Sequence, residues 1–341
     1  PGIGLSRMGP SPSRIVGDTE VFSTPATSPT GGATPRASKS AVAAVAPGLL
    51  AFGKYHPRSP LPTPGYKGNL SDAQQAALES LRTRMVELGL EQAVAAAVIV
   101  PAEDEDGLLL RFLRARQFDV AKAAELLRAD LEWRAELRVP ELATQSEAEV
   151  LGCDPAIFAH YLPGWYESVD LEGRVAQWQK WGDLRVDEVL QHTTHDRLLR
   201  HHVWQQEQLL RRQAENARQQ HVWLAQCVTV VDAKHWHPGL ASRAAMAFLR
   251  DIAGLDQLHY PERMGMIITI NAPYTLSACY AIISTWLDPV TRAKVQIISG
   301  ERYWRPLLEA TFAPDQIPRE YGGTAAVELR DLSARAKYEP H

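Results

Sequence analysis

The chain has 341 residues and a mass of 37.8 kDa, with 45% hydrophobic and 22% charged residues. This balance is typical of a globular protein and excludes a fibrous or wholly disordered one. The 36 basic and 40 acidic residues give a net charge of −4, so no global positive field attracts nucleic acid, and any anion site must be local. Three widely spaced cysteines do not form a disulfide framework, and no apolar run is long enough to span a bilayer.

Residues 1–66 differ in composition from the rest of the chain. They hold 11 of the 23 prolines and 9 of the 22 glycines, and their only acidic residues are Asp18 and Glu20. Such a segment cannot bury enough apolar surface to fold, so we expect a disordered tail. Its Ser-rich, Arg-containing and acid-poor start leaves an organelle transit peptide as the alternative. Residues 67–341, with 30 basic and 38 acidic residues, should contain the folded part.

The first folding signals predict a small helical subdomain over residues 67–140. Polar capping residues at 69–72 precede apolar residues at helical spacing, which predicts an amphipathic helix to about Leu90. Helical periodicity resumes at Asp106 and continues to Leu131, with a break and a new cap at Phe118–Asp119.

From Tyr161 onward, short apolar strands alternate with helices. The expected strands are 174–181, 227–232, 266–270 and 295–298, and the expected helices are 187–219, 240–255 and 276–287. Short, all-apolar strands between helices are typical of βαβ units. We therefore predict an α/β fold in which the helical subdomain is followed, over residues 141–326, by a mostly parallel sheet flanked by helices. Residues 327–341 should form a C-terminal tail.

The sequence lacks the common motifs of catalysis and metal binding. No glycine-rich phosphate loop follows a strand, no serine lies in a nucleophile elbow, and no His-Glu-x-x-His helix occurs. The histidines between His192 and His237 have no cysteine or carboxylate at diagnostic spacing, so we expect them on the surface rather than around a metal. The pattern predicts a protein that is not an enzyme, although an α/β fold alone does not exclude a hydrolase.

Residues 274–287 contain no charged residue at all. The apolar and aromatic side chains that fall on one helical stripe there are Leu276, Cys279, Tyr280, Ile283, Trp286 and Leu287. A helix that is apolar nearly all round is buried or contacts something apolar outside the core. From the residues alone, three interpretations stay open: a core helix, a lid over a hydrophobic cavity, and a helix that contacts a membrane.

The segment that follows has the chemistry of a phosphate site. Asp288 is a good N-cap, after which Thr291 and Lys294 lie on one face of a helix. Free amides, a hydroxyl and an ammonium can converge on one phosphate there, although such a lysine is commonly just solvated. Upstream, Glu262 and Arg263 enter a buried strand, where they either bridge locally or bring a carboxylate near Lys294.

Several motifs occur in register across residues 68–325. They are Leu110–Arg116, Tyr260–Gly265, Ile270–Pro273, Leu287–Thr291 with Lys294, and Pro318 with Gly322–Gly323. Together they resemble the motifs of CRAL-TRIO lipid-binding proteins, especially the phosphatidylinositol/phosphatidylcholine transfer type of fungi and plants. The resemblance implies a helical subdomain and an α/β lobe that encloses one phospholipid in a pocket. It also implies that the uncharged helix at 276–287 is a mobile gate.

The resemblance further implies which residues hold the lipid headgroup. The positions that match Thr291 and Lys294 hold the phosphoinositide phosphate in such proteins, and the position that matches Glu262 supports the lysine. The positions that match Arg263 and Arg116 lie in the same polar network.

The positions implied for phosphatidylcholine depart from the family pattern. Thr229 is kept, but Cys227 stands where a serine is expected, and Gln177 occupies a tyrosine position. Gln117 also replaces the usual lysine after Arg116. Phosphatidylinositol is therefore better supported as a ligand than phosphatidylcholine.

The resemblance implies lipid exchange rather than chemistry, with the bound phospholipid as ligand and no cofactor. We expect a monomer that contacts membrane surfaces peripherally from the cytoplasm, with Golgi or endosomal membranes as the family's usual sites, and no nucleic-acid partner. Two rivals remain: a carrier of a tocopherol-, retinoid- or sterol-like molecule, and an α/β hydrolase. The first rival ligand lacks the phosphate that Thr291 and Lys294 suit, and the second needs a nucleophile and base that no motif supplies.

Overall fold

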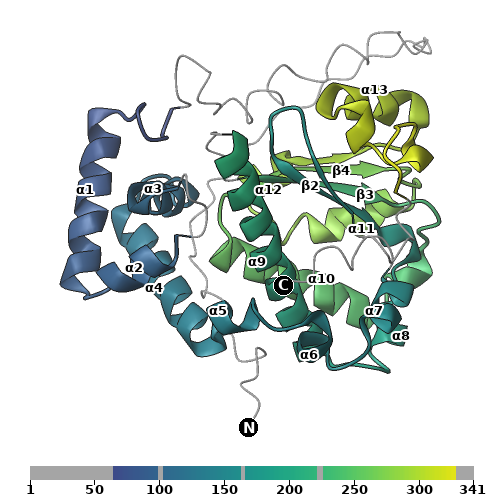
Figure 1. Ribbon diagram of the computed structural model, residues 1–341, viewed down its shortest axis with the longest axis horizontal. Helices are drawn as coiled ribbons and strands as arrows, with labels where there is room; N and C mark the ends of the chain where they lie inside the picture. The colour runs from purple at the N-terminus through teal and green to yellow at the C-terminus, as the bar shows by residue number, and fades with distance from the viewer. Residues whose placement is uncertain (1–63, 99–102, 163–165, 221–225, 328–341) are drawn as a thin grey trace, which may run out of the picture.

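The computed structural model describes residues 64–98, 103–162, 166–220 and 226–327 (Figure 1). The tails expected at 1–66 and 327–341 lie outside these residues, apart from residues 64–66 and 327. Among the helices described, none combines the length and the apolar content needed to cross a membrane.

The helical subdomain consists of α1 (Asp72–Glu87), α2 (Glu91–Ala96), α3 (Glu105–Ala115) and α4 (Val120–Leu137). Ser71 and Gln74 form the capping box that starts α1. The predicted break before α4 is confirmed: Phe118 has a φ of 62°, and Asp119 caps α4 by accepting a hydrogen bond from the Lys122 amide. The apolar stripes of these helices bury one core, which includes Leu81, Leu110, Phe112, Leu113 and Leu127.

Three short helices that the sequence did not predict connect this subdomain to the sheet. They are α5 (Val139–Leu142), α6 (Glu147–Leu151) and α7 (Pro155–Tyr161). Ser146 and Asp154 cap α6 and α7 through their side chains. Helices of four to seven residues carry too few turns to show an apolar period, which explains why the pattern hid them.

The sheet has five strands in the order β1-β2-β3-β4-β5. The strands are β1 (Tyr166–Val169), β2 (Val175–Lys180), β3 (Cys227–Asp232), β4 (Met264–Ile270) and β5 (Val295–Ile297). β1 pairs antiparallel with β2, while β2 to β5 pair in parallel. The prediction of a mostly parallel sheet is confirmed, and β1 was missed.

All crossover helices between the parallel strands lie on one face of the sheet. These are α8 (Val186–Val189) and α9 (His195–Gln220), then α10 (Arg243–His259), and finally α11 (Leu276–Ile283) and α12 (Pro289–Ala293). Right-handed crossovers between strands added in one direction must share a face. The helix α13 (Glu301–Thr311) covers the opposite face, as Figure 1 shows. The helix predicted over 187–219 is in fact α8, a turn and α9.

Alternate residues along the strands point to opposite faces of the sheet, one covered by α13 and the other facing the crossover helices. Trp178, Val230 and Ile268 point to the α13 side and pack in a core with Trp304 and Leu308. Their strand neighbours face α9, α10 and α11 in two rows set by the strand register, Gln177–Thr229–Ile267–Val295 and Gln179–Val231–Thr269–Ile297. Both rows line cavities rather than a packed core.

A matched pair of glycine substitutions tests how closely the chain packs just after strands β2 and β3. A Cβ on Gly182 would lie 1.5 Å from the Lys234 carbonyl oxygen, so Gly182→Ala should lower the free energy of unfolding by about 3 kcal/mol. A Cβ on Gly254, inside α10, meets nothing within 4 Å, so Gly254→Ala should raise it by about 1 kcal/mol through helix propensity. Chemical denaturation measures both changes. Equal stabilities for the two variants would contradict the close approach at Gly182.

Candidate functional site

Two adjoining cavities lie between the sheet and the helices on its α9–α11 side. The large chamber has a volume of about 910 Å³ and the small chamber about 220 Å³. The residues that line both are Trp181, Leu184, Leu249, Ile252, Asp256, Tyr260, Met264 and Ile267. The chambers therefore share a wall, and the large one has the size of a pocket for a sizeable small molecule.

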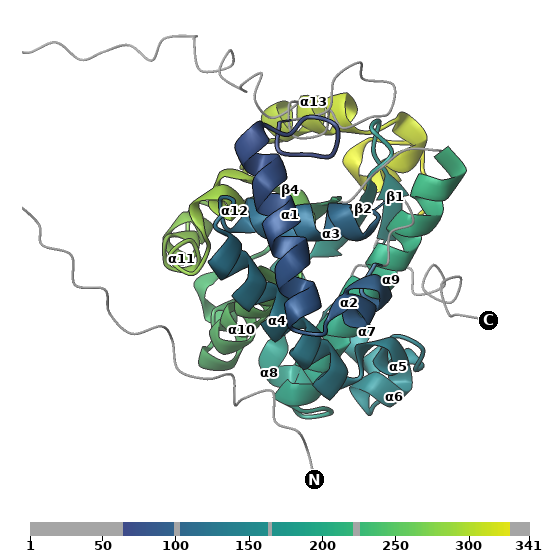
Figure 2. The ribbon, with the colours of Figure 1, turned by 90° about the vertical axis from the view of Figure 1, so that its left-hand side faces the viewer.

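The uncharged helix forms one wall of the large chamber. All six stripe residues predicted for the gate line it: Leu276, Cys279, Tyr280, Ile283, Trp286 and Leu287. No residue of α11 is buried as a whole. Ile282 is 54% exposed, and Tyr274, just before the helix, is 91% exposed. The interpretation as a core helix is therefore wrong. Figure 2 shows α11 at the edge of the molecule next to α12.

Four of the five predicted headgroup residues line this same chamber: Thr291, Lys294, Glu262 and Arg116. Lys294 is only 6% exposed, and its Nζ donates a hydrogen bond to the Met264 carbonyl at 3.0 Å. One expectation about this end is wrong. The amides of Val290 and Thr291 are not free for a phosphate, because Oδ1 of Asp288 accepts from both at 2.9 Å.

Glu262 faces a cation that the sequence analysis did not single out. Its Oε2 lies 3.7 Å from Nε of Arg114, which also lines the large chamber and stacks its guanidinium over the Tyr66 ring at 3.7 Å. Burial raises the pKa of Tyr66, partly offset by the Arg114 charge. The polar end of the chamber thus combines two arginines and a lysine with the carboxylates of Glu262 and Asp288, and Asp256 also lines the chamber.

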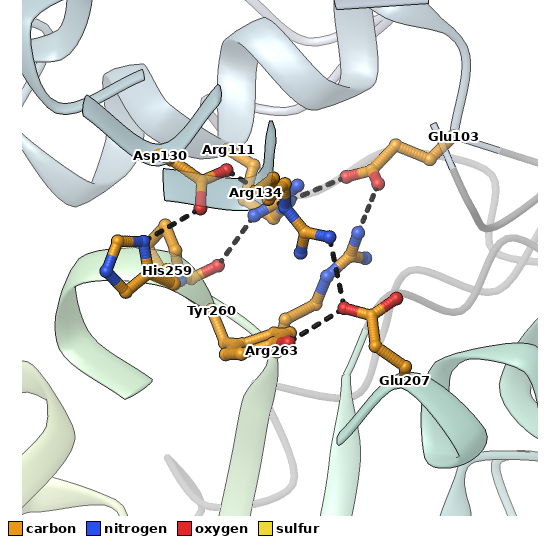
Figure 3. Close-up of polar contacts among 9 residues, drawn as sticks. Glu103, Arg111, Asp130, Arg134, Glu207, His259, Tyr260 and Arg263 are labelled. Carbon is orange, nitrogen blue, oxygen red and sulfur yellow. Dashed lines mark hydrogen bonds and ion pairs between the residues drawn. The ribbon is translucent and has the colours of Figure 1, made fainter. Parts of the chain in front are cut away.

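Arg263 lies in a different place from the other predicted headgroup residues. It lines the small chamber, and its Nη2 donates to Oε2 of Glu103 at 2.6 Å. Arg111 donates to the other oxygen of Glu103 at 3.0 Å, and Figure 3 shows both guanidinium groups directed at this carboxylate. Glu103 is 0% exposed. Burial alone would raise the pKa of Glu103, but the charges and hydrogen bonds of the two arginines lower it to about 2.

The contacts of Glu103 join the helical subdomain to the sheet, and a second set of buried polar contacts lies beside them. We call the two sets together the junction. Arg134 of α4 donates to Glu207 of α9 at 3.0 Å, and the Tyr260 hydroxyl donates to the same oxygen at 2.7 Å. Asp130 of α4 bonds His259 at the end of α10 at 3.0 Å (Figure 3). Charges that are buried in this way are stable only when paired, so the junction fixes the two parts relative to one another.

The junction also holds the loop that carries Glu262. Glu262 has a φ of 61°, a left-handed conformation that is uncommon for a residue with a side chain. Tyr260 and Arg263 on either side are fixed by Glu207 and Glu103, and Arg111 donates to the Pro261 carbonyl at 3.2 Å. The anchored neighbours maintain this backbone and so place the Glu262 side chain at the large chamber.

The small chamber is lined by the two residues predicted as possible phosphatidylcholine contacts, Thr229 and Cys227, and by Gln177, which replaces the family's tyrosine. Burial raises the pKa of the Cys227 thiol to about 12, so the thiol is neutral at physiological pH. Two histidines expected on the surface also line this chamber. His201 is 1% exposed and bonds Glu147 of α6 at 2.9 Å, and His202 bonds Asp256 of α10 at 2.8 Å.

Sequence reasoning missed Glu103, Arg111 and Arg114, and one signal was available for them. Arg111 lies inside the apolar run from Leu108 to Leu113, where a charge requires a buried partner. Nothing in the sequence identifies Glu103 as that partner, because the other end of the contact, Arg263, is 160 residues away.

Comparisons with known proteins agree with this geometry. The chain matches the model of the CRAL/TRIO domain over residues 159–323 and that of the CRAL/TRIO N-terminal domain over residues 66–129. It is 32% identical to the SEC14 cytosolic factor of Eremothecium gossypii, covering 77% of this chain and 80% of the relative. It is 30% identical to the phosphatidylinositol/phosphatidylcholine transfer protein SFH7 of Arabidopsis thaliana, covering 66% of this chain and 40% of that protein. The crystal structure of Sfh5 has the same fold, with a TM-score of 0.57 and 15% identity over 78% of this chain and 97% of that one.

The junction at Glu103 predicts a defined acid sensitivity. Because the pKa of Glu103 falls from an ordinary value of 4.5 to about 2 on folding, its stabilising effect is complete above pH 4.5 and is lost as the pH falls from there toward 2. Glu103→Gln should lower the free energy of unfolding by about 3 kcal/mol at pH 7, with the difference from wild type shrinking below pH 4.5. Thermal unfolding as a function of pH measures this.

The matched control for that experiment is Glu132→Gln. Glu132 pairs with Arg128 on the exposed face of α4, where an ion pair contributes little. A Glu103→Gln protein as stable at pH 7 as the Glu132→Gln protein would contradict the role of the junction.

Proposed function

The chain belongs to the CRAL/TRIO family, and we propose that it binds phosphatidylinositol and transfers it between membranes. The observation that carries this proposal is the large chamber, in which one continuous space joins the apolar wall of α11 to the polar end at Thr291 and Lys294. A phospholipid has the same division into apolar chains and an anionic headgroup. A sterol, retinoid or tocopherol carries no phosphate for Thr291 and Lys294 to bind.

We assign the phosphate to Lys294 first, since Asp288 already accepts from the amides of Val290 and Thr291. The Thr291 hydroxyl also bonds Asp288, so it would turn from that carboxylate to the phosphate when lipid binds. A charge-assisted hydrogen bond from a buried ammonium is stronger than one in water. Arg116 and Arg114 stand at the same end, where they contribute further positive charge. The Glu262 carboxylate offsets part of that positive charge and, through its contact with Arg114, orients the Arg114 guanidinium.

Transfer requires that the bound lipid be stable and yet exchangeable. Burying acyl chains contributes about 0.8 kcal/mol per methylene, so one long chain contributes on the order of 10 kcal/mol. A bilayer supplies the same apolar environment, and therefore the acyl chains favour neither location strongly. The headgroup contacts then decide which lipid is retained.

We call residues 274–287 the gate segment. It separates the large chamber from the outside, and its outer face carries exposed apolar groups such as Tyr274 and Ile282. In our proposal this face enters the membrane interface, so that the chamber opens into lipid rather than into water. The chain would then act at the cytoplasmic surface of membranes as a peripheral monomer, without a catalytic step.

The small chamber is the proposed second ligand site. Its wall offers the Thr229 hydroxyl and the Gln177 amide beside the neutral Cys227 thiol. A thiol is a weaker hydrogen-bond partner than the serine hydroxyl that the family pattern calls for. We therefore propose that phosphatidylcholine binds more weakly than phosphatidylinositol.

Replacement of Lys294 tests the headgroup assignment. Lys294→Ala removes the proposed phosphate contact and should reduce phosphatidylinositol transfer by roughly 10- to 100-fold, the effect of losing one hydrogen bond to a charged group. Transfer of radiolabelled phosphatidylinositol from donor to acceptor vesicles measures this. Thr291→Val should give a smaller loss of the same kind.

The control is Lys122→Ala, which removes a lysine paired with Asp119 on the exposed surface of α4. It should transfer at the wild-type rate. Circular dichroism must show that Lys294→Ala is folded. A folded Lys294→Ala protein that transfers phosphatidylinositol normally would refute the headgroup assignment.

A further inference from the structure

We propose that two residues set the equilibrium between the closed and open positions of the gate segment, Gln257 by stabilising the closed position and Tyr280 by destabilising it. The inference rests on the proposed function, in which this segment closes the large chamber. Gln257 forms hydrogen bonds with the end of the gate segment, whereas the buried hydroxyl of Tyr280 forms none among the described residues.

Gln257 fastens the end of the gate segment to α10. Its Nε2 donates to the Trp286 carbonyl at 2.9 Å, and its Oε1 accepts from the Asp288 amide at 3.0 Å. The second hydrogen of Nε2 goes to the Ala253 carbonyl of α10 at 3.0 Å. Both donor hydrogens and the acceptor are used, so the orientation of the amide is fixed. The side chain thus clips the backbone on either side of Leu287.

The remainder of the gate segment has few polar ties to other elements. Within the described residues, the hydroxyls of Ser284 and Thr285 donate to carbonyls of α11 itself. Among the described residues, two further polar contacts join the gate segment to other elements: Cys279 Sγ lies 3.9 Å from Met246 Sδ of α10, and Arg292 Nη2 of α12 donates to the Leu287 carbonyl at 3.3 Å. Breaking the Gln257 contacts would therefore leave the closed position dependent mainly on apolar contacts.

The hydrogen bonds of Gln257 also connect the gate segment to the proposed headgroup site. Asp288, whose amide bonds Gln257, is the N-cap of α12, the helix that carries Thr291 and ends at Lys294. Gln257 therefore holds the end of the gate segment and the start of the headgroup helix in one arrangement. Movement of the gate segment away from α10 must break the two hydrogen bonds that Gln257 makes with Trp286 and Asp288.

Tyr280 has the opposite effect on the closed position. Its side chain lines the large chamber, yet its hydroxyl is buried and has no hydrogen-bond partner among the described residues. A buried hydroxyl without a partner is unfavourable relative to one in water. Opening of the gate segment would return this hydroxyl to water or to the polar membrane interface, so the closed state alone carries the cost.

Two substitutions should change the opening of the gate segment in opposite directions. Gln257→Leu removes both backbone contacts at similar volume and should increase gate opening by roughly 5- to 30-fold. Tyr280→Phe removes the unpaired hydroxyl and should decrease opening by roughly 5-fold, while slightly raising overall thermal stability. Hydrogen exchange of the amides at 276–287 in the full chain measures opening without lipid, and vesicle transfer of phosphatidylinositol measures its consequence.

Each variant has a matched control. Gln316→Leu removes a glutamine that likewise accepts a backbone hydrogen bond, from Val169 at 3.0 Å, but at the edge of the sheet. Tyr274→Phe removes an exposed hydroxyl from the same gate segment. Neither should change exchange at 276–287, whereas a general loss of stability would change it in Gln316→Leu as well.

The two readouts separate this inference from the proposed function. Unchanged exchange at 276–287 in Gln257→Leu, or faster exchange in Tyr280→Phe, would overturn the inference even if transfer is normal. The expected exchange shifts in a protein that transfers no phosphatidylinositol would support the gate residues and refute the function. Shifts in exchange that transfer rates follow would support both.

Discussion

The division of the sheet into a packed face and an open face is the constraint on which the site depends. Side chains alternate along a strand, so residues that pack under α13 on one side fix which residues face α9, α10 and α11 on the other. The parallel register then aligns Gln177, Thr229, Ile267 and Val295 in one row along the cavity floor. A shift by one residue would move Trp178 and Ile268 into the cavity and remove the core.

Because the strands are added in one direction, the crossovers all lie above that open face. The last crossover, between β4 and β5, contains both the gate segment and the headgroup helix α12. In the proposed function, one short piece of chain therefore serves both opening and headgroup binding. The buried junction at Glu103 and Glu207 fixes the loop that enters β4 and carries Glu262, and in the proposed function this loop stays in place when the gate segment moves.

The sequence predicted the elements whose patterns are local. The N-terminal cap of α1, the break at Phe118 and the β-branched strand β3 each depend on neighbouring residues, and the structure has all three. It did not predict α13, in which Pro306 interrupts the helical signal, or β1, which is only four residues long. The residues that line the gate wall could be named in advance because their helical stripe is free of charges.

What the sequence could not supply are contacts between distant residues. His201 looks like a surface residue on a polar helix until Glu147 of α6 is placed beside it. Arg263 belongs to a family motif, but the sequence does not show that it bonds Glu103 of the helical subdomain and lines the small chamber. Asp288 was expected to cap α12, but the same cap occupies the amides that were expected to bind phosphate. In each case the sequence does not show which partner a polar group contacts.

Native mass spectrometry tests the central claim most directly, namely that one phospholipid occupies the large chamber. The full chain would be incubated with vesicles that contain phosphatidylinositol, phosphatidylcholine and cholesterol, re-isolated, and weighed intact. The account predicts a single added mass per chain, that of phosphatidylinositol, with phosphatidylcholine in the minority. A chain that carries no lipid, or that carries cholesterol in preference to either phospholipid, would contradict it.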